Sequence, residues 1–130
     1  MRSVDVIATP MLRIAGTVIV LLALAGGIAP AGAADFFELL EDVPVMPELE
    51  PVADAGIEFD TPSGRIVEAY AIGATSRRAV LSFYRRTLPQ LGWQAGAGDA
   101  FLREDESLSI DFFGADGELT VRFTIAPAAN

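Results

Sequence analysis

The stretch that decides the fold is TSRRAVLSFYRRTLPQLGW, residues 75–93. Placed on a helix with about 100° per residue, its apolar and aromatic side chains gather on one face and its arginines on the other. The predicted inward residues are Val80, Phe83, Tyr84, Thr87, Leu88 and Leu91. Thr75 or Ser76 can cap the first turn, and the Leu-Pro step should end the regular helix near Thr87, because the residue before a proline avoids helical geometry. The stretch therefore predicts one amphipathic helix that covers a sheet.

The segments that follow this helix are typical of strands. Gly92 can take the positive φ angle of the exit, and Trp93 then begins a strand, with a buried indole N–H that needs an acceptor. Residues 100–103 form a short strand, whereas residues 107–113 and 118–126 alternate strictly between apolar and polar side chains. The predicted inward residues of the two long strands are Leu108, Ile110, Phe112, Leu119, Val121, Phe123 and Ile125.

A hairpin is predicted before the helix. Residues 57–59 and 65–72 form its strands, and the TPSG turn at residues 61–64 joins them. The small side chains suited to close approach of a helix are Val67, Ala69 and Ala71. The elements then run in the order β-β-α-β-β-β. This pattern predicts an α+β fold, a two-layer sandwich with one helix over an antiparallel sheet, in a domain of residues 57–127.

Residues 1–33 have the features of a secretory signal peptide. A basic residue, Arg13, precedes an apolar run from Ile14 to Ile28, and the Ala-Gly-Ala that ends the segment fits a cleavage site. An uncleaved N-terminal membrane anchor is the alternative, and either Met1 or Met11 can be the start of the protein. Because the chain has no Cys, attachment as a lipoprotein is excluded. Both alternatives export the domain: it is periplasmic or secreted after cleavage, or held at the inner membrane by the anchor.

Residues 34–56 form a lead-in segment rich in proline and acidic residues. The part from Asp35 to Asp42 can form one or two helical turns, after which three prolines favour an extended path. Two alternatives follow from its large apolar side chains: the lead-in packs back on the domain, or it is a strip that binds a partner. We expect packing on the domain, because a solvated linker does not need so many apolar side chains.

Composition excludes several classes of function. The chain has neither His nor Cys, and so lacks the commonest metal ligand, the usual general base and any thiolate metal site. Its net charge is −9, and after residue 33 it has 7 Arg and 17 acidic residues, a net −10 that repels nucleic acid. No serine has a His or Lys as a base, and the acidic turns lack the pattern of a calcium loop. We therefore expect no enzyme, no metal and no cofactor; the alternative is a small hydrolase that uses carboxylates alone.

The outer face of the predicted helix carries the candidate site. Arg78, Arg85 and Arg86 share this face in an otherwise acidic protein. They either pair with the acidic turns or lead-in of their own domain, where each pair contributes little, or bind an acidic partner. We predict a protein-binding or envelope-associated module with a protein partner in the cell envelope. Nucleic acid is not an expected partner, and membrane contact is expected only through an uncleaved N-terminal segment.

Three segments resemble a family of small exported bacterial proteins of unknown function: GRIVEAYAIG at residues 64–73, FYRRTLPQLGW at residues 83–93, and the two alternating strands. The signature Phe-Tyr-x-x-x-Leu-Pro-x-x-Gly-Trp stands here at Phe83, Tyr84, Leu88, Pro89, Gly92 and Trp93. The resemblance extends over about residues 57–125. It implies the same fold and an exported location, and it supplies no catalytic residue.

Overall fold

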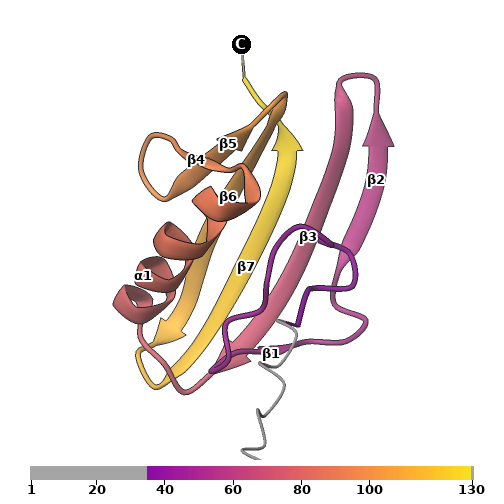
Figure 1. Cartoon of the computed structure of the whole chain (residues 1–130). Helices are drawn as coiled ribbons and strands as arrows, with labels where there is room; N and C mark the ends of the chain where they lie inside the picture. The colour runs from indigo at the N-terminus through magenta and orange to yellow at the C-terminus, as the bar shows by residue number, and fades with distance from the viewer. Residues whose placement is uncertain (1–34, 130) are drawn as a thin grey trace, which may run out of the picture. The chain divides into compact units, whose positions relative to one another are not determined.

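Seven strands form one antiparallel sheet in the computed structural model, which describes residues 35–129 (Figure 1). The strands are β1 (Glu50–Pro51), β2 (Ile57–Thr61), β3 (Gly64–Gly73), β4 (Gln94–Ala95), β5 (Ala100–Arg103), β6 (Glu106–Ala115) and β7 (Glu118–Pro127). They lie in the order β1-β3-β7-β6-β5-β4, and β2 also pairs with β3. The α+β class is confirmed. The expected element order is wrong: with β1, and with β4 where a strand was expected to begin at Trp93, it is β-β-β-α-β-β-β-β. The two residues of β1 are too few for an alternating pattern.

Helix α1 (Arg77–Thr87) ends where expected and is continued by the 3₁₀ turn η1 (Leu88–Leu91). The side chain of Ser76 caps α1 by accepting a hydrogen bond from the Ala79 N–H at 3.1 Å. Contrary to expectation, Leu88 keeps helical angles before its proline (φ −62°, ψ −37°). The tighter 3₁₀ winding turns Leu91 away from the sheet, so its predicted inward position is wrong: it is 37% exposed. Gly92 has the expected positive φ angle of 90°.

One face of the sheet is buried, and the alternating patterns identified it correctly. The buried strand residues are Val67, Ala69, Ala71, Phe101, Leu108, Ile110, Leu119, Val121, Phe123 and Ile125, with Phe112 partly buried beside them. Registers in which Ala69 lies opposite Phe123, and Phe123 opposite Ile110, bring these side chains into one layer. From the helix, Val80, Tyr84 and Leu88 complete this core.

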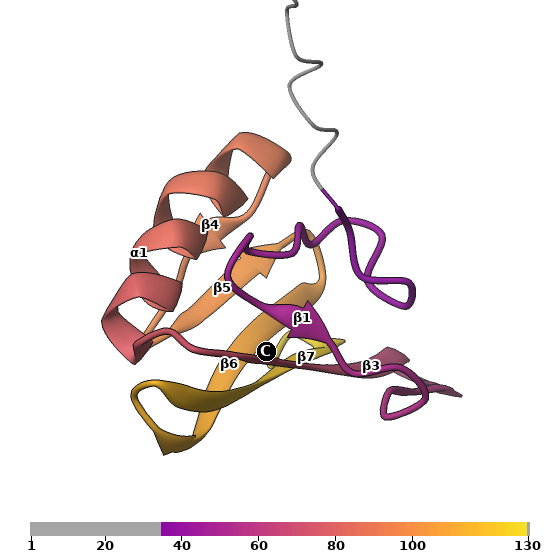
Figure 2. The same cartoon turned by 90° about the horizontal axis from the view of Figure 1, so that it is seen from below.

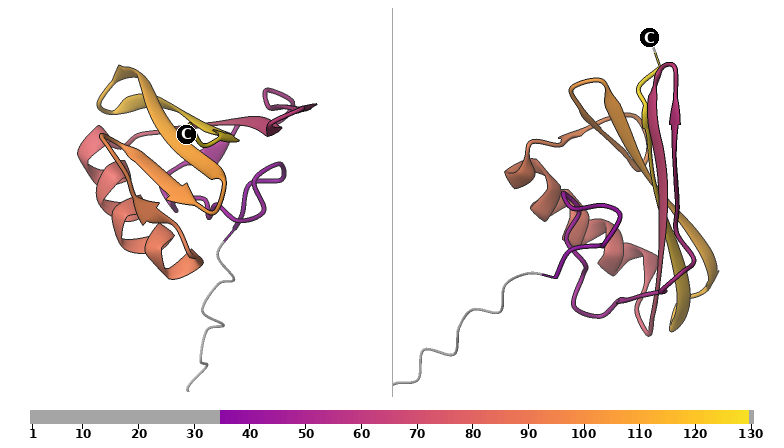
Figure 3. Two further views of the ribbon diagram at one scale, coloured as in Figure 1. Left: turned by 90° about the horizontal axis from the view of Figure 1, so that it is seen from above. Right: turned by 90° about the vertical axis from the view of Figure 1, so that its right-hand side faces the viewer.

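Two segments, α1 and the lead-in, together cover the buried face of the sheet, and we call them its two covers. Figures 2 and 3 show α1 and the lead-in on the same side of the sheet, with α1 towards β6 and the lead-in towards β3. The buried apolar residues of the lead-in are Phe37, Leu40, Val43, Val45, Met46 and Leu49. Its main chain passes so close to β3 that a Cβ atom at Gly73 would collide with the carbonyl oxygen of Glu48. The lead-in thus packs on the domain, as the first alternative states, and belongs to the same core as residues 57–127.

The helical turns expected between Asp35 and Asp42 are absent from the described part of the lead-in. Main-chain bonds within turns take their place, including Val43 N–H to Leu40 O at 2.9 Å, and Phe36 forms an isolated bridge with Pro44. The apolar spacing fits a helix locally. Here, however, the side chains of Phe37 and Leu40 reach the sheet from a turn, because the short segment must fold back beside α1.

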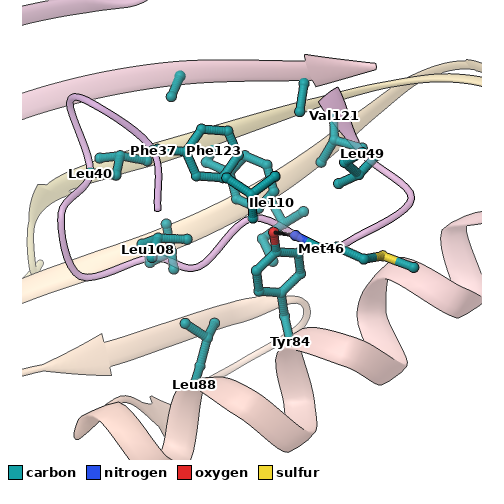
Figure 4. Packing of buried hydrophobic residues seen from close by; sticks show 14 of the residues in the cluster. Phe37, Leu40, Met46, Leu49, Tyr84, Leu88, Leu108, Ile110, Val121 and Phe123 are labelled. Atoms are coloured by element: carbon teal, nitrogen blue, oxygen red, sulfur yellow. Dashed lines mark hydrogen bonds between the residues drawn. The ribbon is translucent and has the colours of Figure 1, made fainter. Parts of the chain in front are cut away.

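Tyr84 links the two covers of the sheet, α1 and the lead-in, by hydrogen bonds (Figure 4). Its ring projects from α1 into the core, where its hydroxyl donates to the Pro44 carbonyl oxygen at 2.8 Å and accepts from the Met46 N–H at 3.2 Å. Burial raises the pKa of the Tyr84 phenol well above its ordinary value near 10, and the bond from Met46 opposes this shift only in part. The hydroxyl therefore fixes the path of the lead-in without leaving a buried polar group unpaired on either side.

Replacing Tyr84→Phe is expected to lower the free energy of unfolding by about 1–3 kcal/mol at pH 7, because the Met46 N–H is left buried without a partner. The variant should also differ from wild type in how its free energy of unfolding depends on pH in the alkaline range. The pKa of the Tyr84 phenol is higher in the folded than in the unfolded state. The phenol therefore stabilises the folded state fully below pH ~10 and loses that contribution as the pH rises above this value. Urea unfolding at pH 7 and pH 11 checks this: the difference in free energy of unfolding between wild type and variant should be smaller at pH 11. An unchanged difference would contradict the assignment.

Candidate functional site

The outer side of α1 forms an open groove of about 540 Å³ on the surface. Its lining residues are Arg77, Arg78, Leu81, Ser82, Arg85 and Arg86, a set we call the arginine face. All three predicted site residues, Arg78, Arg85 and Arg86, are among them and are exposed. Sequence reasoning missed Arg77 and Leu81 as members. The spacing signals them, because positions 77, 81 and 85 and positions 78, 82 and 86 form two neighbouring rows four residues apart.

The members of the arginine face differ in their partners. Arg85 pairs with Asp99 at 3.0 Å, and both side chains are largely exposed. The Arg86 Nε–H donates to the Ser82 carbonyl oxygen at 3.1 Å, and the Arg77 guanidinium lies 5.2 Å from the centre of the Phe112 ring. Within residues 35–129, no carboxylate lies within ion-pair distance of Arg77, Arg78 or Arg86. Of the alternative in which the arginines pair with their own acidic turns, only the Arg85–Asp99 contact is present in this part of the chain.

Arginines elsewhere in the described domain are all paired. Arg65 bonds to Glu106 at 3.0 Å, Arg103 to Asp42 at 2.7 Å, and Arg122 to Asp111 at 3.1 Å. The hydrogen bonds that Arg65 donates to Glu106 and Arg122 donates to Asp111 raise the pKa of both arginines. The pairs are structural: each joins two strands, or a strand and the lead-in. The contrast singles out the helix, which holds the three arginines whose guanidinium groups have no carboxylate partner among the described residues.

The indole of Trp93 fills the end of the core, as expected from its size. It is buried, and the Arg103 guanidinium stacks over its ring at 4.3 Å from the ring centre while bonding to Asp42. The expected acceptor for the indole N–H is not found among the described residues. This stack ties strand β5 to the lead-in and has a structural role.

A second open groove, of about 610 Å³, lies where β1 meets the ends of β3 and β7. Three carboxylates line it, those of Glu48, Glu50 and Glu118, and all three residues are exposed. Across residues 35–129, no charged residue is buried, and no group of three or more acidic side chains is placed to hold a metal ion. The groove therefore offers exposed carboxylates and main-chain groups to a ligand, without a buried acid or base.

One of the acidic turns has a structural task. The Asp116 carboxylate accepts a hydrogen bond from the Arg77 N–H at 3.0 Å, and the next residue, Gly117, donates its N–H to the Thr75 carbonyl oxygen at 2.9 Å. The β6–β7 turn thus caps the start of α1, where a negative charge is stabilising. This contact fixes the end of α1 on the sheet and so sets the direction of the arginine face.

The signal-peptide and anchor predictions concern residues 1–33, which lie outside the described residues. Within the described range, no helix combines the length and the hydropathy that a membrane span requires. Comparison of the chain with protein-family models, with curated proteins and with solved structures found no match.

Proposed function

We propose that this protein is an exported, non-enzymatic binding module whose arginine face binds an acidic protein in the cell envelope. The observation that carries the proposal is the placement of charge. The domain has 10 more acidic than basic residues after residue 33, yet four of its seven arginines lie on one helix. The guanidinium groups of three of these four have no carboxylate partner within residues 35–129.

The chemistry of the arginine face suits such a partner. A planar guanidinium binds carboxylates with two parallel hydrogen bonds, and exposed arginines in a row can engage several acidic side chains at once. Leu81, half-buried in the row between Arg77 and Arg85, adds an apolar contact to the groove. Exposed charge pairs change association rate and salt dependence more than affinity, so the binding should weaken as salt is raised.

Export, and membership of the family with the Phe-Tyr-x-x-x-Leu-Pro-x-x-Gly-Trp signature, are parts of the same proposal. Both rest on the sequence, namely the apolar segment up to residue 33 and the signature between Phe83 and Trp93. The signature residues lie mainly in the core or in the exit turn of the helix. They therefore support the scaffold that presents the arginine face and leave the choice of partner to the exposed side of the helix.

The proposal predicts a photo-crosslink from the centre of the arginine face. A photo-reactive amino acid at Ser82, which is exposed in the groove, should give a crosslinked product with an acidic protein when intact cells are irradiated. The same amino acid at Thr124, on the other side of the sheet, is the control and should not give that product. Absence of any product from Ser82, or the same product from both positions, would contradict the proposal.

The triple substitution Arg78→Gln, Arg85→Gln and Arg86→Gln tests the charges directly. We expect it to weaken capture of the crosslinked partner by about 3- to 150-fold, because three exposed charge pairs contribute about 0.2–1 kcal/mol each. Thermal melting should stay within a few degrees of wild type, since these side chains are exposed. The matched control replaces the same three residues by Lys, which keeps the charge and should retain most of the binding. Equal capture by the Gln variant would exclude the arginine face as the site.

A further inference from the structure

Strand β2 is an uncovered edge of the sheet. It pairs with β3 alone, and in Figure 1 it lies at the right-hand limit of the sheet with no element beyond it. Residues Ile57 to Asp60 are all exposed. The main-chain N–H and C=O groups on its free side have no strand partner among residues 35–129. A row of such groups is a template for one more strand.

The two faces of β2 differ sharply in chemistry. Ile57 and Phe59 lie on the uncovered face of the sheet and are 49% and 48% exposed. On β3, Ile66 lies opposite Phe59 and extends this apolar strip, whereas Glu68 lies opposite Ile57. The alternate residues Glu58 and Asp60 lie on the other face, opposite Val67 and Arg65. An added strand would therefore meet apolar side chains on one side of the sheet and carboxylates on the other.

The carboxylates of Glu58 and Asp60 are available for pairing. Arg65, which lies directly opposite Asp60, is bonded to Glu106 on β6 at 3.0 Å. No ion pair within the described residues involves Glu58 or Asp60. A second copy of the chain pairing edge to edge would bring four such carboxylates together, and like charges on neighbouring strands are destabilising. This repulsion makes the chain itself a poor occupant of its own edge.

We propose that β2 binds an extended segment of a partner protein in which apolar and basic residues alternate. The segment adds a strand to the sheet, with its apolar side chains beside Ile57 and Phe59 and its Lys or Arg side chains beside Glu58 and Asp60. Main-chain hydrogen bonds supply affinity that is independent of sequence, and the alternation supplies the specificity. About five residues match the length of β2. This site shares no residue with the arginine face and is independent of it.

Two capped nine-residue peptides of equal composition test the proposal on the full chain. In one, Val and Arg alternate; in the other, the same residues stand in two blocks. We expect the alternating peptide to bind and to slow amide hydrogen exchange in β2, and the block peptide to bind about tenfold more weakly. Equal binding of the two peptides, or slowed exchange elsewhere than at the β2 edge, would overturn the proposal. So would slowed exchange in β2 of the free protein together with a dimeric mass in sedimentation, because the occupant is then a second copy.

Substitutions at the edge separate a specific site from attraction to an acidic protein. Glu58→Gln with Asp60→Asn should weaken binding of the alternating peptide about tenfold. The matched control, Glu104→Gln with Asp105→Asn, removes the same charge from an exposed turn and should change binding less than about twofold. Glu58→Lys with Asp60→Lys should instead bind a peptide that alternates Val and Glu. If the edge and turn variants weaken binding equally, the attraction comes from net charge and the strand-addition site is excluded.

Discussion

A chain that lacks residues 35–49 is expected not to fold. This segment buries six apolar side chains against the sheet and α1. At about 1.5–3 kcal/mol for each buried side chain, their loss removes roughly 9 kcal/mol or more, which compares with a net stability of about 5–15 kcal/mol for a whole domain. Far-UV circular dichroism and urea unfolding of a chain that begins at Glu50, compared with one that begins at Asp35, measure the effect.

A peptide of residues 35–49 provides the control for this truncation. Added in excess, it should restore part of the folded signal, because a segment that binds only the folded state shifts the equilibrium by mass action. A peptide in which Phe37 and Leu40 are replaced by Ser should restore less, since these two side chains are buried in the core. A truncated chain that unfolds at nearly the same urea concentration as its parent would show that the lead-in is not part of the core.

Replacing Phe123→Ala is expected to cost about 3–5 kcal/mol, the second-largest effect that we predict. Phe123 is fully buried on β7, with ring centres 4.8 Å from Phe37 of the lead-in and 5.0 Å from Tyr84 of the helix. Both covers of the sheet meet on this ring, so its removal leaves a cavity that neither cover can fill alone. Urea unfolding at pH 7 gives the change in free energy.

Phe113→Ala is the matched control for Phe123→Ala. The residue type is the same, but Phe113 lies on the uncovered face of the sheet and is 46% exposed. The Arg122 guanidinium lies 5.2 Å from its ring centre, a contact of about 0.5–1 kcal/mol at an exposed site. We expect this variant to lose roughly 1 kcal/mol. Equal losses for the two variants would contradict the assignment of the buried face.

The regular elements could be predicted because each has a local signal. Alternation over seven or more residues identified β6, β7 and their buried side chains, since the side-chain period of a strand is two. The helix followed from its apolar face and from Ser76 as its cap. Leu91 was misplaced because a helical wheel assumes one constant turn per residue, whereas the chain tightens to a 3₁₀ turn after Thr87.

The parts that could not be predicted depend on distant contacts. Strand β1 contains two residues and is defined only by its pairing with β3. The strand expected to begin at Trp93 is β4, but its length of two residues is set by its pairing with β5. The path of the lead-in is set by Tyr84, about 40 positions further along the chain, through its bonds to Pro44 and Met46. Local spacing favoured helical turns in the lead-in, and the contacts with the sheet and helix overrode it.

The candidate site was predicted in part, for the same reason. Arg78, Arg85 and Arg86 were found from the helical wheel, which places them on the outer side. Which arginines have carboxylate partners could not be read from the sequence, because the pairs Arg65–Glu106 and Arg103–Asp42 join residues 41 and 61 positions apart. The sequence alone likewise does not predict that β2 is an edge strand, because this follows from the order of the strands in the sheet.

The register of the sheet also determines when the chain can fold. The long pairing of β3 with β7 joins Val67 to Ile125, and the lead-in contacts Phe123 from the other end of the domain. A growing chain that has not yet reached β7 has no centre for its sheet and no surface on which the lead-in can pack. Folding must therefore wait for the last strand, and with so many contacts between distant positions it should take milliseconds to seconds. Until then the chain stays unfolded, because neither the sheet nor the lead-in has its central contacts.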